Sequence, residues 1–231
     1  MSFLQRLRGL LRNRSGVAMV EFALGAPFLL TAGLWGTEIA NYALVNMKIS
    51  QLAEHIADNA SRIGDTSTLQ NRRIYESDIN DVIYGAQVQG GKLGLYDNGR
   101  VIISSLETDS DSATTNQYIH WQRCRGLKTY ASPYGDEGQN LGAAGMGPPD
   151  EQVTAEPGDA VIFVEISYTY QPLISAQFLG SLDITSIASF TVRDNRDLSQ
   201  IYQRDPGSPD PVQNCNLHTG DAKIGTDGTF G

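Results

Sequence analysis

The sequence predicts an α+β fold in which one long N-terminal helix packs against a mostly antiparallel sheet. Two observations predict it. First, an apolar stretch near the N-terminus runs directly into a pattern with one apolar helix face, which indicates a single helix of about 65 to 70 Å at 1.5 Å per residue. Second, later segments alternate apolar and polar residues, as strands do. The one-sided part of the helix can cover the apolar face of such a sheet.

The charge of the chain argues against a nucleic-acid partner. Its 231 residues include 26 acidic and 17 basic side chains, which gives a formal net charge of -9. Nucleic-acid binding depends on clustered Lys and Arg that neutralise phosphates. The clear basic cluster lies in a leader of residues 1–16 that contains no acidic residue: Arg6, Arg8, Arg12 and Arg14.

Residues 17–37 have the length and apolar character of one membrane crossing. Residues 22–37 carry no charge, and only Glu21 interrupts the apolar run before them. Lys and Arg are absent between Arg14 and Lys48. By the positive-inside rule, the N-terminus is therefore expected in the cytoplasm and the chain beyond about residue 40 on the other side.

A cleavable secretory signal is an alternative interpretation, because it also combines basic residues with an apolar run. Two features disfavour it. The sequence has no A-x-A pattern between Ala18 and Ala43, and the helical periodicity continues beyond Trp35 instead of breaking. We therefore expect the apolar helix to be retained.

Residues 38–64 are predicted to continue the helix with one apolar face. The apolar positions are spaced three or four apart: Tyr42, Val45, Ile49, Leu52, Ile56, Ala60 and Ile63. The opposite face is polar: Lys48, Gln51, Glu54, Asp58 and Arg62. Gly64 and Asp65 then provide a stop for the helix.

Residues 65–205 are predicted to form an α+β head. A short helix capped by Ser77 or Asp78 would bury one side: Ile79, Val82, Ile83 and Ala86. Asp97-Asn98-Gly99, between two apolar segments, predicts a tight hairpin. Strands are predicted at 118–124, 160–170 and 182–193, within an antiparallel sheet of about four to six strands. The glycine- and proline-rich stretch 131–158 and a tail of residues 206–231 are predicted to be irregular.

The two cysteines, Cys124 and Cys215, form either one disulfide or two unpaired thiols, because neither belongs to a C-x-x-C pair or stands near a metal-like His cluster. Disulfides persist in oxidising compartments such as the bacterial periplasm. The predicted topology therefore favours the disulfide, which would fasten the tail to the head.

No catalytic, cofactor or metal site is predicted, and we expect a protein that is not an enzyme. His55, His120 and His218 are scattered, without metal-ligand spacing to another His, Cys or carboxylate. Glu107, Asp109 and Asp111 form an acidic cluster, but the calcium-loop template fails after them. A solvated acidic turn is the expectation there, with a weak cation site as the alternative.

Glu21 is the residue that most needs an explanation. An ionised carboxylate inside a bilayer costs several kcal/mol and is normally retained only with a partner or a function. Glu21 is the fifth residue after Gly16, so a cut between Gly16 and Val17 would place a new α-amino group, of pKa about 8, near it. In a stack of staggered helices, the amine of one subunit would meet the carboxylate of the next and set their register. The alternative is a helix-end carboxylate at the level of the lipid headgroups.

These features resemble the class III signal of type IV prepilins, in which a short basic leader ends in Gly and an apolar stretch follows with Glu fifth after the cut. Within that superfamily, the run RSGVAMVEFALGAPFLL, followed by Glu38, resembles the TadE-like family of the Tad tight-adherence pilus system. The matching positions are Arg14, Gly16, Val20, Glu21, Phe22, Ala23, Leu24 and Pro27. The resemblance covers roughly the first 60 residues.

The resemblance implies a lollipop-like type IV pilin fold and a minor pilin or pseudopilin that acts in pilus biogenesis and adhesion. It implies cleavage by a prepilin peptidase, with other pilins and Tad assembly proteins as partners. The chain would sit in the bacterial inner membrane with a periplasmic head, and enter an extracellular pilus. Two alternatives remain open: a signal-anchored periplasmic enzyme or binding domain that does not polymerise, and a pseudopilin of type II secretion.

Overall fold

The computed structural model describes residues 15–65, 71–109, 116–174, 180–193 and 195–222. The chain forms two compact units. The first comprises Met1–Leu44 with Pro172–Gly180, and the second comprises Val45–Gln171 with Ser181–Gly231. The connection Pro172–Gly180 therefore belongs with the N-terminal unit, whereas the sequence analysis placed it in the head.

Helix α2 spans Ser15–Ala60 and contributes to both units. Its 46 residues correspond to about 69 Å, which confirms the single long helix that the sequence predicts. Pro27 lies inside it and lacks an N–H group, and the hydroxyl of Thr31 donates to the Pro27 carbonyl at 2.7 Å. Within the described residues, α2 is the one helix long and apolar enough to cross a membrane.

The guanidinium group of Arg196 caps the C-terminus of α2. Arg196 Nη2 donates to the carbonyl oxygens of Ala60 at 3.0 Å and Ile63 at 3.1 Å. Ala60 is the last residue of α2 and Ile63 follows the helix end, where the last carbonyls lack helical partners and a positive charge is favourable. Gly64 follows with φ of 125°, a left-handed conformation suited to glycine, so the predicted stop at Gly64 lies just beyond the observed end.

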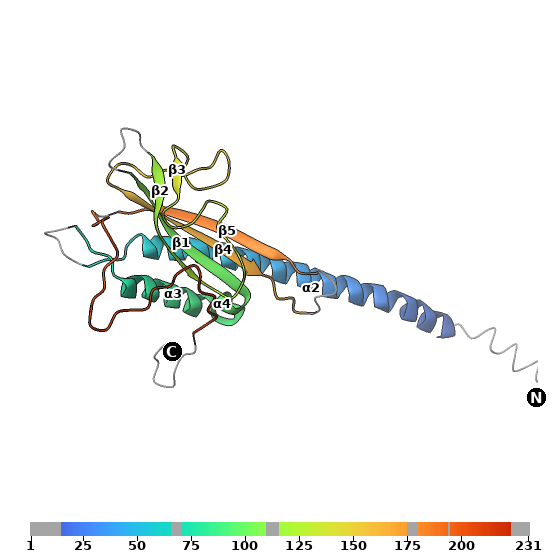
Figure 1. The fold of residues 1–231 in the computed structure, drawn as a ribbon. Helices are drawn as coiled ribbons and strands as arrows, with labels where there is room; N and C mark the ends of the chain where they lie inside the picture. The colour runs from blue at the N-terminus through green and yellow to red at the C-terminus, as the bar shows by residue number, and fades with distance from the viewer. Residues whose placement is uncertain (1–14, 66–70, 110–115, 175–179, 194, 223–231) are drawn as a thin grey trace, which may run out of the picture. The chain divides into compact units, whose positions relative to one another are not determined.

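The second unit contains a five-stranded antiparallel sheet (Figure 1). Its strand order is β3-β2-β1-β4-β5. The strands are β1 Gly99–Thr108, β2 Gln117–Arg125, β3 Asn140–Gly142, β4 Ala160–Thr169 and β5 Asp183–Thr191. The structure thus confirms the α+β class, the antiparallel sheet and the three predicted strands, which correspond to β2, β4 and β5.

The hairpin predicted at Asp97-Asn98-Gly99 is wrong. Residues Gly91–Leu93 and Leu95–Asn98 form the short helices η1 and α4, and β1 begins only at Gly99. The Asn98 amide donates to the carbonyls of Leu93 and Gly94 at 3.1 and 3.2 Å, so Asn-Gly ends a helix here instead of turning between strands. Burial of Leu95 and Tyr96 in the core favours this local helix over an extended segment.

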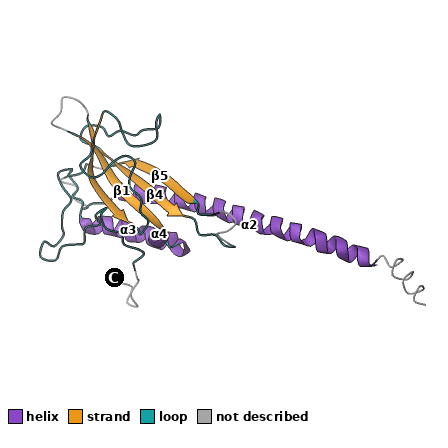
Figure 2. Ribbon diagram, turned by 45° about the vertical axis from the view of Figure 1, so that its right-hand side comes forward, coloured by secondary structure: helices purple, strands orange, loops and turns teal. Residues whose placement is uncertain are grey.

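One face of the sheet is covered by helices (Figure 2). Helix α3 spans Glu76–Gly90, and its predicted buried side is confirmed: Ile79, Val82, Ile83 and Ala86. The cap is Tyr75, not Ser77 or Asp78. Asp78 instead lies one turn inside the helix, where its carboxylate accepts the Tyr75 N–H at 3.2 Å, as the N3 residue of a capping box does.

The part of α2 that belongs to the second unit lies along the same side of the sheet as α3 (Figures 1 and 2). The apolar face predicted for residues 42–63 is buried at four of its seven positions: Ile49, Leu52, Ile56 and Ala60. Tyr42, Val45 and Ile63 are half-buried. On the polar face, Lys48 Nζ reaches across to the Gly90 carbonyl of α3 at 2.8 Å, while Gln51, Glu54 and Arg62 are exposed.

The other face of the sheet is covered by an irregular segment. Side chains of β1, β2 and β4 on that face form a core with residues from the stretch 131–158: Leu106, Ile119, Met146, Ala155, Val161 and Phe163. Tyr134 packs edge-on against the Phe163 ring, with 5.2 Å between ring centroids. The stretch is irregular as predicted, apart from β3, yet it provides the second layer over the sheet.

Candidate functional site

The predicted cleavage and assembly residues lie at the start of α2. Gly16, Val17 and Glu21 are exposed, and Val17 and Glu21 share one helix face because they are four residues apart. The large side chains around them are also exposed: Met19, Val20, Phe22 and Leu24. The described residues of the first unit include no Lys, Arg or His, so Glu21 has no cationic partner among them.

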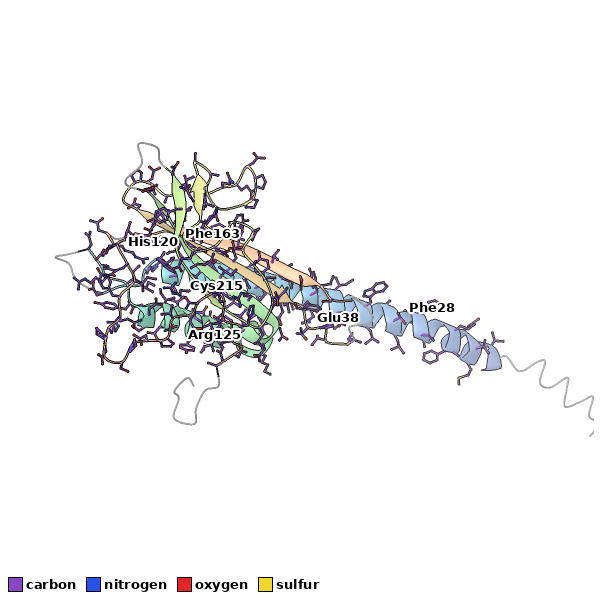
Figure 3. The ribbon with its side chains drawn as sticks, in the orientation of Figure 1. Phe28, Glu38, His120, Arg125, Phe163 and Cys215 are labelled. Carbon is purple, nitrogen blue, oxygen red and sulfur yellow. A yellow bond between two sulfur atoms is a disulfide. The ribbon has the colours of Figure 1, made fainter. Side chains whose placement is uncertain are left out.

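A second carboxylate of the first unit is buried. Glu38, labelled on α2 in Figure 3, is 1% exposed. Its two oxygens accept the backbone N–H groups of Leu173 and Ile174 at 3.1 and 2.9 Å. The carboxylate thereby holds residues 172–174, which we call the clamped turn, on α2. The resemblance includes Glu38, but this contact joins residues 135 positions apart and has no local sequence signal.

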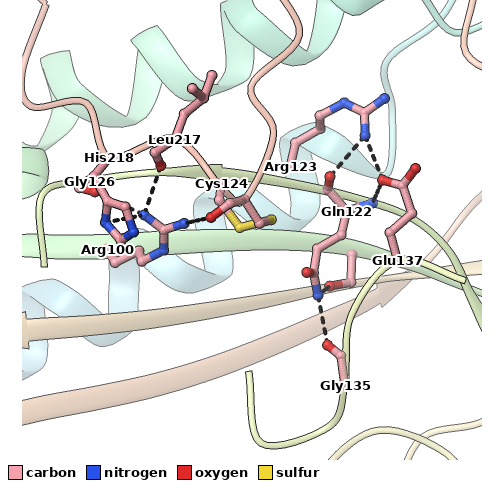
Figure 4. The surroundings of a disulfide bond; sticks show 11 residues. Arg100, Gln122, Arg123, Cys124, Gly126, Gly135, Glu137, Leu217 and His218 are labelled. Carbon is pink, nitrogen blue, oxygen red and sulfur yellow. Dashed lines mark hydrogen bonds and ion pairs between the residues drawn. A yellow bond between two sulfur atoms is a disulfide. The ribbon is translucent and has the colours of Figure 1, made fainter. Parts of the chain in front are cut away.

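The disulfide predicted between Cys124 and Cys215 is present (Figure 4). It joins the end of β2 to the irregular segment 213–222, which we call the C-terminal arm. Two backbone hydrogen bonds also attach the arm to this strand end. The Cys124 N–H donates to the Gln213 carbonyl at 2.8 Å, and the Gly126 N–H donates to the Thr219 carbonyl at 3.0 Å. The described part of the tail is thus irregular, as predicted, and fastened to the sheet.

The side chain of Arg100 of β1 contacts the C-terminal arm (Figure 4). The residue is 2% exposed, and its Nη1 donates to the carbonyls of Gly126 and Leu217 at 3.0 and 3.1 Å. Its Nη2 donates to the Cys215 carbonyl, and burial lowers the pKa of Arg100. A hollow of about 560 Å³ opens beside it. Because its two Nη atoms donate to carbonyl oxygens of the arm and of Gly126, the guanidinium positions the arm.

A buried ion pair links α3 to the sheet. Arg123 of β2 donates through Nη2 and Nε to the Glu76 carboxylate at 2.6 and 3.1 Å, and both side chains are at most 8% exposed. Its Nη1 reaches the half-exposed Glu137 at 2.9 Å. Burial lowers the pKa of Arg123, but the two carboxylates more than offset this, so that its pKa is raised overall.

In the acidic cluster after β1, the predicted solvated turn is wrong for Glu107, whereas Asp109 is exposed as predicted. Glu107 is 2% exposed and accepts a hydrogen bond from Ser105 Oγ at 2.7 Å. His120 Nδ1 lies 2.9 Å from its other oxygen, and this hydrogen bond raises the pKa of His120 against the effect of burial. Asp111 lies outside the described residues. Both oxygens of the Glu107 carboxylate are therefore hydrogen-bonded to neighbouring side chains.

No family model, no curated protein and no solved structure matches this chain. Function is therefore inferred from its own residues. Across the part of the chain that the structure describes, no group of three His, Cys, Asp or Glu side chains is arranged to hold a metal ion. What distinguishes the first unit is an exposed apolar helix surface with one carboxylate at each end of its uncharged run, Glu21 and Glu38.

Glu165 of β4 is a buried acid that the sequence analysis missed, because it stands in an apolar strand without a paired charge nearby in sequence. Burial raises the pKa of Glu165 to about 7, although hydrogen bonds from Ser132 and Tyr130 lower it. The Tyr130 hydroxyl donates to one carboxylate oxygen at 3.3 Å, and the other oxygen has no hydrogen-bond partner among the described residues. The carboxyl group of the folded chain is therefore mostly protonated below pH 7 and mostly ionised above it.

Replacing Glu165 with glutamine is expected to flatten the pH dependence of stability. The folded state binds the Glu165 proton more tightly than the unfolded chain does, because the carboxyl of the unfolded chain has the usual pKa of 4.5. The protonated carboxyl therefore makes its full contribution to the free energy of unfolding below pH 4.5, and this contribution is lost as the pH rises through 7. At pH 8 the Glu165→Gln variant should exceed the natural chain by roughly 3 kcal/mol in free energy of unfolding. Denaturant unfolding from pH 4.5 to 8 measures this. The exposed Glu156→Gln serves as control, and identical slopes for all three chains would contradict the prediction.

Proposed function

We propose that this chain is a membrane-anchored structural subunit, a minor pilin or pseudopilin of a Tad-type pilus system. The observation that carries the proposal is Glu21: a lone carboxylate in the exposed apolar surface of α2, five residues after Gly16. A carboxylate in such a surface needs a counter-charge, and the described residues of the first unit provide none.

Cleavage between Gly16 and Val17 would supply that counter-charge. The new α-amino group would be cationic at neutral pH, because its pKa is about 8. The same cut would place Glu21 in the first turn or so of the shortened helix, where the helix dipole favours a negative charge. Within one helix the amine and the carboxylate are poorly oriented toward each other, so the amine of a neighbouring subunit is the better partner, and the pair would set the register between subunits.

The surface of α2 supports a membrane anchor as the starting point for assembly. Its apolar side chains up to Trp35 are exposed on all sides, as expected for contact with lipid or with neighbouring helices: Val17, Phe22, Leu24, Phe28, Leu29, Leu30, Leu34 and Trp35. The basic leader would remain in the cytoplasm, and the second unit would lie in the periplasm. The Cys124–Cys215 disulfide fits that oxidising compartment.

Replacing Glu21 with alanine is expected to leave membrane insertion and cleavage after Gly16 intact but to reduce assembly. Insertion survives because the substitution removes a charge from the apolar segment. Recovery of the protein with its pilin partners should fall about tenfold or more, since the register contact is lost. The measurements are N-terminal sequencing after co-expression with a prepilin peptidase, which should find Val17 first, and co-purification with pilins. Glu54→Ala, on the polar face of the same helix, is the matched control.

Two results would contradict the proposal. If the Glu21→Ala variant assembled unchanged, Glu21 would not make the contact that sets the register between subunits. A mature N-terminus at Met1, or a cut near residues 36 to 43, would favour a signal-anchored or secreted periplasmic domain that does not polymerise.

A further inference from the structure

The clamped turn exposes apolar side chains beside the end of the uncharged stretch of α2. Leu173 is 67% exposed and Ile174 is 36% exposed. On α2, Leu34 and Trp35 are about half exposed, and together with Ile174 they line a small hollow of about 40 Å³. The four side chains form what we call the collar patch. In water such a patch is unfavourable, because apolar surface remains unburied.

The Glu38 carboxylate satisfies backbone N–H groups of the clamped turn, so that the turn can lie in an apolar environment. A backbone N–H without a hydrogen-bond partner costs several kcal/mol in a lipid environment. Here the N–H groups of Leu173 and Ile174 both donate to Glu38, so their donors are satisfied without water. The turn therefore presents its side chains outward while its N–H groups face the carboxylate.

The position of Glu38 along α2 fixes the depth of the collar patch. Residues 17–37 span about 30 Å as a helix, which is the thickness of the hydrocarbon layer. Glu38 and the turn it holds would then lie where the headgroup region begins, and Trp35 would occupy the depth that tryptophan prefers at membrane interfaces. The whole connection from Gln171 to Leu182 contains no charged residue, which is unusual for a loop in water and fits an apolar boundary.

We propose that the collar patch inserts into the lipid interface at the outer end of the membrane span, so that the clamped turn is a second point of membrane contact. This inference rests on the membrane anchor of the proposed function. Lipid is the occupant because the patch is continuous with the apolar surface of α2 and includes no charge that a protein partner would recognise. The contact would fix how far the helix protrudes from the bilayer.

The test places a fluorescent NBD label on the full-length chain with Leu173→Cys, in nanodiscs of phosphatidylethanolamine and phosphatidylglycerol. The native cysteines are joined to each other, so the new thiol is labelled selectively under non-reducing conditions. Lipids with a nitroxide near the headgroup should quench this label more strongly than lipids with a nitroxide deep in the acyl chain. Leu29→Cys, which is 76% exposed within the span, is the depth standard and should show the reverse order.

The outcomes separate this inference from the proposed function. Quenching at position 29 without quenching at position 173 overturns the collar patch alone, whereas a lack of quenching at both positions overturns the membrane anchor. The label at position 173 could instead respond to the number of protein copies per nanodisc and not to nitroxide lipids. That result would assign the patch to a contact with a second copy and would overturn lipid insertion.

A variant of the clamp tests whether Glu38 holds the turn in place. In a Glu38→Gln background, quenching of the Leu173 label should fall at least about twofold, because an amide oxygen replaces a carboxylate that accepts two N–H groups. Glu54→Gln, on the same helix, should leave the quenching unchanged. Equal quenching in the Glu38→Gln and natural backgrounds would overturn the clamp as the positioning contact.

Discussion

The Arg123→Met variant is expected to lose about 3 to 5 kcal/mol in free energy of unfolding, because it leaves Glu76 as a buried charge without its partner. The Glu76 carboxylate is 5% exposed and receives two hydrogen bonds from the guanidinium. Its location in the first turn of α3 offers some compensation from the helix dipole, but at most about 1 to 2 kcal/mol. Guanidinium chloride unfolding of the full-length chain in detergent measures the loss.

The chain offers a matched control, because the same arginine contacts a second carboxylate that is exposed. Glu137→Gln removes the 2.9 Å contact with a 52% exposed side chain and should cost about 0 to 1 kcal/mol. The double variant Arg123→Met, Glu76→Gln removes both buried charges and should be less destabilised than the sum of the single variants. Equal losses for Glu137→Gln and Arg123→Met would show that burial of the pair does not determine its contribution.

Removing the disulfide is expected to lower the free energy of unfolding by about 4 to 5 kcal/mol in the chain-entropy model, since the bridge closes a loop between cysteines 91 positions apart. The Cys124→Ser, Cys215→Ser double variant tests this without leaving a reactive thiol. We expect the C-terminal arm to remain attached part of the time, because Arg100 and the backbone of Cys124 and Gly126 still bond to it. Proteolysis of the arm should therefore become faster, while the sheet persists.

Reduction of the natural chain supplies the control for the disulfide. A reducing agent should bring its unfolding midpoint down to that of the double variant and should leave the double variant unchanged. A natural chain whose stability does not respond to reduction would contradict a stabilising bridge. Faster cleavage of the arm in both reduced proteins, with an intact sheet, would locate the effect at the arm.

The elements that the sequence predicts correctly are those with local periodicity. The long helix follows from an uncharged run joined to apolar positions three or four residues apart, and the side of α3 that carries Ile79 and Ile83 follows from the same spacing. Strands β2, β4 and β5 follow from alternation and β-branched content. The error at Asp97-Asn98-Gly99 arose because Asn-Gly suits a helix end as well as a hairpin, and only the buried neighbours Leu95 and Tyr96 decide between the two.

Side-chain roles that depend on distant segments were not predictable. Glu107 belongs to an acidic run in sequence, yet His120 and Ser105 surround it in the structure. Glu165 has no unusual neighbour along the chain, and its raised pKa results from burial in the folded chain. That stretch itself carries turn-forming glycines and prolines, which indicate irregular backbone but do not show that it covers a sheet face.

The sequence by itself determined the long helix, its one apolar face, the pattern of strands and the position of Glu21 relative to Gly16, because each depends on spacing along a few turns or a single strand. Only the tertiary structure decided that Glu38 holds the clamped turn, that Arg123 pairs with Glu76, and that the arm returns to β2. Those contacts join residues 47 to 136 positions apart. Their partners are chosen by the packing of whole elements, which leaves no local pattern in the chain.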